Sequence, residues 1–227
     1  MSVAFDHARD IVALERSLGI VVEPQLQGAI IDHPALVTLV NWVYVWAHWP
    51  VILGWVVWMW THHRDAYPVY RNAVLISGAA GMVDFAHYPL APPRLVPHLG
   101  LVDTIALRSN SYRVLQPPSL TNIYASMPSL HFGWNLLVGI AILRHARTIL
   151  GRLFGILLPI AMFSAIILTA NHYIVDGVAS GAFALTALAI SAYVTPHWSR
   201  ALNHISLNRL RPVAVPARRS RTTGGCP

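Results

Sequence analysis

The chain has 227 residues, a length that fits one domain, and 55% of them are hydrophobic whereas only 11% are charged. This balance excludes an ordinary soluble domain and indicates a membrane protein. The formal net charge is +7, and every basic residue is Arg. The lack of Lys, with many Ala, Val, Leu, Gly and Pro residues, suggests a GC-rich bacterial genome, so we expect a bacterial plasma membrane. With Cys226 as its one cysteine, a single chain can form neither a disulfide nor a cysteine metal site.

Residues 1–34 are predicted to form an amphipathic N-terminal segment. Five acidic residues lie in it, and no basic start precedes an apolar core, so it does not have the pattern of a signal peptide. Ile11, Leu14 and Leu18 recur near helical spacing, and Pro24 marks the expected end of the helix. We expect this helix to lie on the membrane surface or against the rest of the protein.

Residues 35–196 are predicted to form the membrane domain. About 20 apolar residues cross the hydrocarbon core as a helix, and five runs approach or meet that length. These runs are 35–60, 72–88, 129–143, 153–170 and 172–195. A sixth span hidden in the N-terminal region is an alternative. The expected fold class is therefore all-α, a polytopic transmembrane helical bundle of five to six spans with an N-terminal amphipathic helix.

Arginine-rich connections orient this predicted bundle. They are residues 61–71, residues 144–152 and the tail 197–227, which we expect to be disordered. Five spans place all three on one side, which the positive-inside rule makes cytoplasmic. The loop 89–128 and the junction at Asn171 then lie on the extracytoplasmic side.

The chain has two polar motifs, and each opens an apolar run. The second motif along the chain is His-Tyr-Ile-Val-Asp at residues 172–176. Polar groups at membrane depth cost several kcal/mol unless they face a cavity or a partner, so such a motif suggests a reaction centre. His172 and Asp176 are four residues apart and share one helix face. A carboxylate that holds one ring nitrogen would leave the other as a nucleophile. A purely structural His–Asp hydrogen bond would give the same pattern.

The first motif is Ser-Met-Pro-Ser-Leu-His at residues 126–131, just where another apolar run begins. Free N–H groups at a helix start attract anions, so Ser126 and Ser129 could cradle phosphate oxygens. His131 could protonate a leaving oxygen. Simple capping of a helix would also explain a Pro-Ser start. Because both motifs face the same side of the membrane, together they favour one shared site.

The two motifs resemble those of the type 2 phosphatidic acid phosphatase superfamily, and more closely its inositol phosphorylceramide synthase-like branch. That branch has the signatures P-S-L-H and H-Y-x-x-D, and the resemblance covers about residues 88–179. It implies that His172 attacks phosphorus, that Asp176 orients this histidine, and that His131 is the general acid. It implies no metal and no other cofactor, because the histidines must stay free.

The chain departs from the superfamily pattern at its cationic positions. Where the larger superfamily has K-x6-R-P, His87 stands seven residues before Arg94, and Ile166 occupies the place of a further Arg. A transferring phosphoryl group needs positive charge around it. The missing cations must therefore be replaced, or the substrate carries less charge, as a phosphodiester does.

Arg94 is the first candidate for a phosphate ligand, because two prolines stiffen its loop, although an Arg at a span end can also serve topology alone. The other phosphate-binding candidates are Ser129, Ser126 and His87, with Arg108 and Arg113 as second choices. Asp84 is expected to pair with Arg94 or His87, and His48 to be a buried core histidine.

The sequence predicts an integral membrane lipid phosphatase or phosphotransferase. It would act on a lipid phosphate or phosphodiester headgroup through a phosphohistidine, with water, inositol or another alcohol as acceptor, on the extracytoplasmic side. We expect membrane lipid as its partner and no nucleic acid, and the oligomeric state stays open. The alternative is a non-catalytic lipid-binding scaffold, or a transporter that uses intramembrane His and Asp, although no internal halves are visible.

Overall fold

The computed structural model describes residues 2–108 and 122–209, with the backbone alone for residues 2, 108 and 196–209. This part of the chain is helical and contains no strand, which confirms the predicted all-α class. The helices are α1 (Ser2–Ser17), α2 (Glu23–Ile31), α3 (Pro34–Trp46), α4 (Trp49–His62), α5 (Tyr67–His87), α6 (Thr104–Arg108), α8 (Leu130–His145), α9 (Ile149–Leu168) and α10 (Ile174–Arg209), with 3-10 turns at Pro93–Leu95 and Pro97–Leu99.

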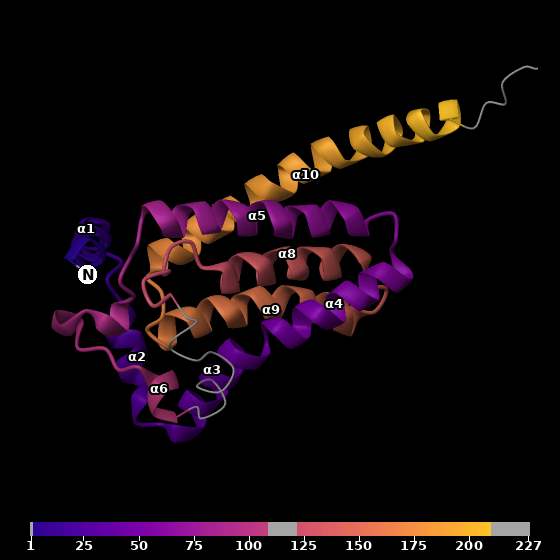
Figure 1. The fold of residues 1–227 in the computed structure, drawn as a ribbon. Coiled ribbons are helices and arrows are strands. Elements are labelled where there is room, and N and C mark those ends of the chain that lie inside the picture. The colour runs from indigo at the N-terminus through magenta and orange to yellow at the C-terminus, as the bar shows by residue number, and fades with distance from the viewer. Residues whose placement is uncertain (1, 109–121, 210–227) are drawn as a thin grey trace, which may run out of the picture.

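Four of these helices, α4, α5, α8 and α9, run lengthwise through the molecule, and α10 starts beside them and continues past α5 (Figure 1). The short helices α1, α2 and α6 gather at the end where α10 begins. The turns between α4 and α5 and between α8 and α9 lie at the opposite end. The short helices α1, α2 and α6 therefore mark one end of the bundle, and the turns that follow α4 and α8 mark the other end.

Two described helices, α9 and the part of α10 from Ile174 to Thr195, are long and apolar enough to cross a membrane. The pair α3 and α4 is a third candidate if it counts as one span bent by 45°. The predicted count of five to six spans is not reached by this criterion. The bend falls before Pro50, because proline lacks the N–H that would continue α3 and its ring crowds the preceding turn.

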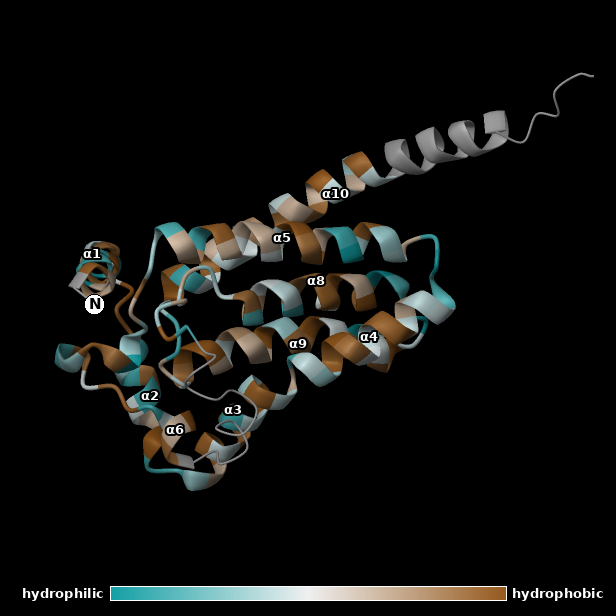
Figure 2. Cartoon of the chain, in the orientation of Figure 1, coloured by the Kyte–Doolittle hydropathy of each residue, from teal (hydrophilic) through white to brown (hydrophobic). Residues whose placement is uncertain are grey.

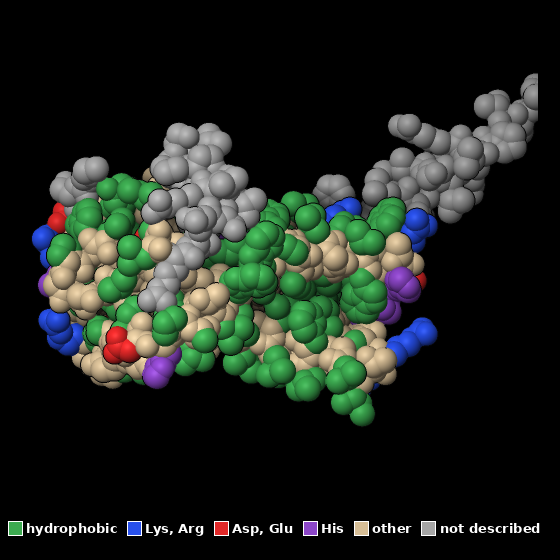
Figure 3. All heavy atoms as spheres, turned by 90° about the horizontal axis from the view of Figure 1, so that it is seen from below, with side chains coloured by type: hydrophobic (Ala, Val, Ile, Leu, Met, Phe, Trp, Pro, Cys, Tyr) green, Lys and Arg blue, Asp and Glu red, His purple; other side chains and the backbone are tan. Residues whose placement is uncertain are grey.

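The surface of the bundle is compatible with an integral membrane protein. Apolar residues dominate the middle of the long helices (Figure 2). On the face shown in Figure 3, apolar side chains cover the centre while charged and His side chains lie toward the two ends. Large side chains of α9 are exposed, with Leu157 at 50% and Ile160 at 57%. Exposed apolar surface of this extent marks contact with lipid or with a partner.

The backbones of α8 and α9 approach closely at a pair of glycines. A Cβ on Gly139 would lie 2.5 Å from the carbonyl oxygen of Gly155, and a Cβ on Gly155 would lie 2.8 Å from that of Gly139. Small residues allow such packing between helices in membranes. This contact fixes α8, and with it His131, against α9.

The N-terminal segment packs against the bundle, one of the two placements that its amphipathic pattern allows. Buried residues of α1, among them Ala8 and Ile11, contact Leu90 and Tyr173. The helix ends earlier than Pro24, because Gly19 adopts a left-handed φ of 70° after Ser17. A second helix, α2, then follows.

Two buried carboxylates of this segment cap the start of α10. Glu23 accepts a hydrogen bond from the backbone N–H of Ile174 at 3.2 Å, and Glu15 accepts one from Val175 at 2.9 Å. The free N–H groups at a helix start are stabilised by such acceptors. Burial, with the nearby carboxylates of Glu23 and Asp176, raises the pKa of Glu15 to about 8 despite the bond from Val175.

Gly139→Ala tests the contact between α8 and α9. Its methyl group would meet a backbone atom that cannot rotate away, so we expect the free energy of unfolding to fall by about 1–3 kcal/mol. Gly54→Ala is the matched control, because a Cβ there meets nothing within 4 Å. Thermal unfolding of the two purified variants measures the difference, and equal stabilities would disprove the close approach.

Glu15→Gln tests the capping carboxylate. In the wild type the folded state keeps the Glu15 proton that the unfolded chain loses, so stability should fall as the pH rises from about 4.5 to about 8. The amide that replaces the carboxyl can still accept the Val175 bond but does not titrate, so this part of the pH dependence should vanish. Unfolding temperatures measured across this range check the result against Asp10→Asn, an exposed acid of the same helix. If the stability of Glu15→Gln fell with pH as steeply as that of the wild type, the raised pKa of Glu15 would be contradicted.

Candidate active site

The two sequence motifs meet at a cavity of about 190 Å³. It lies where α8 starts and where the turn from α9 leads into α10. Four predicted site residues line it: Arg94, Ser126, His131 and His172. Its volume is below the several hundred Å³ of pockets that enclose a drug-sized ligand. It therefore suits a phosphate with a small neighbouring group, while lipid chains would stay outside.

His172 precedes α10 and faces Asp176 in the first turn of that helix. The two residues therefore do not share a helix face as predicted, because α10 begins only at Ile174. The ring nitrogen Nδ1 of His172 is 3.5 Å from Oδ2 of Asp176. Both residues are buried, Asp176 completely. This separation is longer than a standard hydrogen bond, as pairs of catalytic groups often are before substrate binds. Since Nδ1 faces the carboxylate, Nε2 is the ring nitrogen left for the cavity.

The carboxylate of Asp176 is itself held in place. Its Oδ2 accepts a hydrogen bond from the hydroxyl of Ser126 at 2.6 Å and one from the backbone N–H of Tyr173 at 3.1 Å. The second bond is the return half of a capping box, with Asp176 at the third helical position. Ser126, predicted to bind phosphate, thus has a partner within the protein and links the first motif to the second.

The turn that carries His172 has a strained backbone. Ala170, fully buried, adopts a left-handed φ of 55°, a conformation that costs a residue with a Cβ about 1–3 kcal/mol. The N–H groups of Asn171 and His172 both donate to the carbonyl of Ile166, at 3.2 and 3.1 Å. These bonds fix the direction in which His172 leaves the turn.

Arg94 is attached to this same turn. Its backbone N–H donates to the carbonyl of Ala170 at 3.0 Å, and its Nη1 donates to the side-chain oxygen of Asn171. Its Nε is 3.0 Å from a carboxylate oxygen of Asp103. Arg94, one of the two partners expected for Asp84, therefore pairs with Asp103 instead, because the loop folds back over the turn.

His131 is held between two aromatic rings. It stacks on Tyr44 with centroids 4.4 Å apart and on His48 with centroids 4.2 Å apart. His48 is buried as expected, but it contacts the site: its Nδ1 is 3.2 Å from the side-chain nitrogen of Asn135, which also donates to the carbonyl of His131. Stacking on these two rings thus restricts the orientation of the His131 ring.

Two other residues that were predicted to bind phosphate, Ser129 and His87, do not line the cavity. Ser129 is completely buried before α8, and its hydroxyl has no hydrogen-bond partner among the described residues. His87 is exposed on α5, where its Nδ1 is 2.8 Å from the carbonyl oxygen of Val83, and it does not line the cavity. The side chain of Arg108 and all of Arg113 lie outside the described residues.

Sequence reasoning missed several residues of the site. Asn171 could have been found, because it directly precedes His172 in the motif. Asp103, Tyr44 and Asn135 reach the site through tertiary packing and carry no local signal. Within the described residues, no group of three or more His, Cys, Asp or Glu is arranged to hold a metal ion.

One of three comparisons with known proteins gives a match. A family profile described as the PAP2 superfamily matches residues 9–190, which include both motifs. No curated protein and no solved structure shows significant similarity to the chain. The profile covers most of the chain, from α1 into α10, and so includes all the segments that build the cavity. The chain belongs to the PAP2 superfamily.

Proposed function

We propose that this protein is an integral membrane enzyme that hydrolyses or transfers the phosphoryl or phosphodiester headgroup of a lipid through a phosphohistidine on His172. Membership of the superfamily supports phosphatase-type activity on a phosphoester. The observation that carries the proposal is the meeting of His172, His131 and Arg94 at one cavity, with Asp176 behind the first histidine.

The first half of the reaction uses both histidines. Nε2 of His172 attacks phosphorus and forms a P–N bond, while the bond from phosphorus to the lipid oxygen breaks. Protonated His131 gives its proton to that oxygen, which leaves as an alcohol. Asp176 faces Nδ1 and stabilises the positive charge that develops on the ring of His172.

The second half restores the enzyme. An acceptor hydroxyl attacks phosphorus, its proton passes to neutral His131, and the P–N bond breaks. Water as acceptor gives a phosphatase, and an alcohol such as inositol gives a phosphotransferase. The resemblance to the inositol phosphorylceramide synthase-like branch supports an alcohol.

The charge around the cavity supports a substrate of low charge. Among the described residues that line it, Arg94 is the one Arg or Lys, and Asp103 offsets part of its charge. A phosphate monoester carries up to two negative charges near neutral pH, whereas a phosphodiester carries one. A phosphodiester therefore needs less positive charge from the protein.

We place the reaction on the extracytoplasmic side of a bacterial plasma membrane, and the position of the site in the bundle supports that side. The cavity lies at the end of the bundle opposite the arginine-rich connections at residues 61–71 and 144–152. By the positive-inside rule those connections face the cytoplasm. Five spans, formed by α3 with α4, α5, α8, α9 and α10, would give this arrangement.

His172→Gln tests the nucleophile. We expect it to lower the rate of phosphate or headgroup release by about a thousandfold or more, because Gln has no ring nitrogen to form the P–N bond. The assay uses the full chain with phospholipids and polyprenyl phosphates, with and without free inositol. His33→Gln, an exposed histidine, is the matched control.

The pattern of products separates the possible activities. Free inorganic phosphate indicates a phosphatase, and product that requires an added alcohol indicates a transferase. Equal behaviour of the wild type and His172→Gln on every lipid would contradict the catalytic proposal and favour a non-catalytic lipid-binding scaffold or a transporter.

Ser126→Ala tests whether Ser126 positions Asp176 or binds phosphate. Loss of a hydrogen bond to a charged group should lower kcat by about 10–100-fold with little change in KM. A raised KM with unchanged kcat would instead show that Ser126 binds the substrate. Ser164→Ala, which removes an exposed hydroxyl on α9, is the control.

A further inference from the structure

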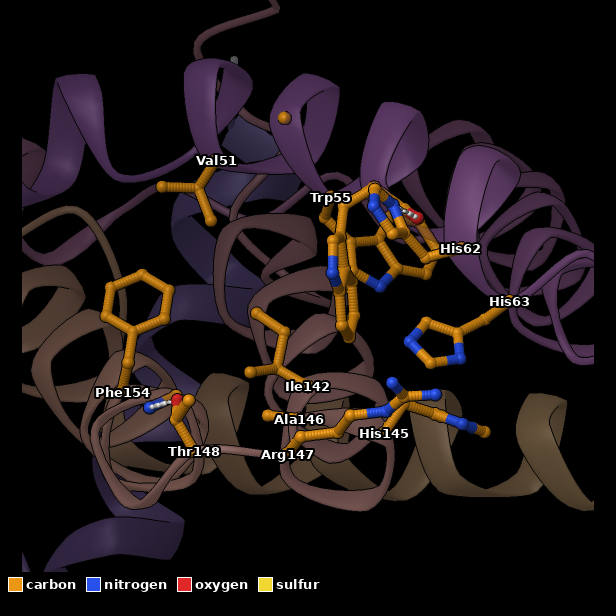
Figure 4. A pocket seen from close by; sticks show the side chains of 13 residues that line it. Val51, Trp55, His62, His63, Ile142, His145, Ala146, Arg147, Thr148 and Phe154 are labelled. Carbon is orange, nitrogen blue, oxygen red and sulfur yellow. Dashed lines mark hydrogen bonds between the residues drawn. The ribbon is translucent and has the colours of Figure 1, made fainter.

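A second and larger cavity, of about 570 Å³, lies at the end of the bundle opposite His172 (Figure 4). It is formed by α4, the end of α8, the turn at residues 146–148 and the start of α9. None of its lining residues belongs to either motif. Its volume falls in the range of pockets that enclose small-molecule ligands.

The lining has two chemically different parts. Val51, Ile142 and Phe154 form an apolar wall, whereas His63 and Arg147 lie on the other side, with His62 and His145 (Figure 4). The lining residues include no Asp or Glu. This division fits a ligand with an apolar chain and an anionic head.

The basic groups at this cavity lie close together. The rings of His63 and His145 are 5.0 Å apart between centroids. Burial, and then the neighbouring His63 and Arg144, lower the pKa of His145. A bound anion would offset this mutual repulsion and favour the charged form of the histidine.

Trp55 also lines this cavity. Its side chain extends from α4 into the cavity (Figure 4) and is only 4% exposed. Its indole N–H has no hydrogen-bond partner among the described residues. Because this nitrogen has almost no accessible surface, Trp55 contributes its apolar ring to the lining and not a donor.

We propose that this cavity binds one anionic phospholipid of the membrane leaflet opposite the active site. Its phosphate would lie among His63, His145 and Arg147, and an acyl chain would follow the apolar wall. A phosphate with adjoining ester groups offers more acceptors than a fatty-acid carboxylate, which matches the several donors here. The proposal does not rest on the catalytic one.

The test counts lipids bound to the purified full chain by native mass spectrometry in mild detergent, during titration with phosphatidylglycerol. The double variant His63→Gln with Arg147→Gln should weaken binding of the first lipid about tenfold, since it removes charge-assisted hydrogen bonds. Arg64→Gln is the matched control, because Arg64 lies at the same end but stacks over Trp60 and does not line the cavity.

A space-filling variant tests the apolar part separately. Gly54 lines the cavity, and a Cβ there meets nothing within 4 Å, so Gly54→Leu should fold and occupy the path of the chain. We expect a loss of affinity of about tenfold here as well. An unchanged unfolding temperature in lipid-free detergent confirms that each variant is folded.

Three ligand arms identify the source of the anion. Phosphatidylcholine with the same chains should bind more weakly, and glycerol phosphate and oleate should not displace phosphatidylglycerol. Equal binding of phosphatidylcholine, displacement by either competitor, or unchanged phosphatidylglycerol affinity in both cavity variants would overturn the proposal.

Discussion

One buried oxygen, Oδ2 of Asp176, joins the segments that build the catalytic cavity. It accepts from Ser126, which precedes α8, and from the backbone of Tyr173, and it faces His172. The next two N–H groups of α10 are bound by Glu23 and Glu15 of the N-terminal segment. A buried carboxylate destabilises a fold unless such partners surround it. Hydrogen bonds at the start of α10 thus join this helix to α1, to α2 and to the segment that precedes α8.

This arrangement keeps the reacting groups in place before substrate arrives. Arg94 is bound to the turn at Ala170 and Asn171, so the cation and His172 share one rigid support. His131 comes from another helix but is fixed by stacking on Tyr44 and His48. Groups that are oriented in advance stabilise developing charge without the cost of reorganisation. The strained backbone at Ala170 fits a turn whose geometry serves the site.

The features predicted from sequence are those with local causes. The helix start at residues 129–130 follows from the Pro-Ser sequence. His172 and Asp176 are neighbours as their spacing predicted, although His172 lies in the turn before α10 and not on the helix. Long-range contacts had no such signal: Asp103 beside Arg94 and Glu15 at α10 depend on how loops and helices return to the bundle. Composition predicted the all-α class, but the predicted five to six spans are not confirmed. The helix α8 has only 16 residues, and polar and small residues lower the mean hydropathy of α5.

Capture of a phosphorylated enzyme tests the central claim most directly. The full chain is mixed with a lipid labelled at phosphorus and quenched within one turnover, and the label on the protein is counted. We predict a phosphoprotein that is labile to acid and stable to alkali, as a P–N bond is, and that is absent in His172→Gln. Turnover without labelled protein, or label that persists in His172→Gln, would contradict a phosphohistidine on His172.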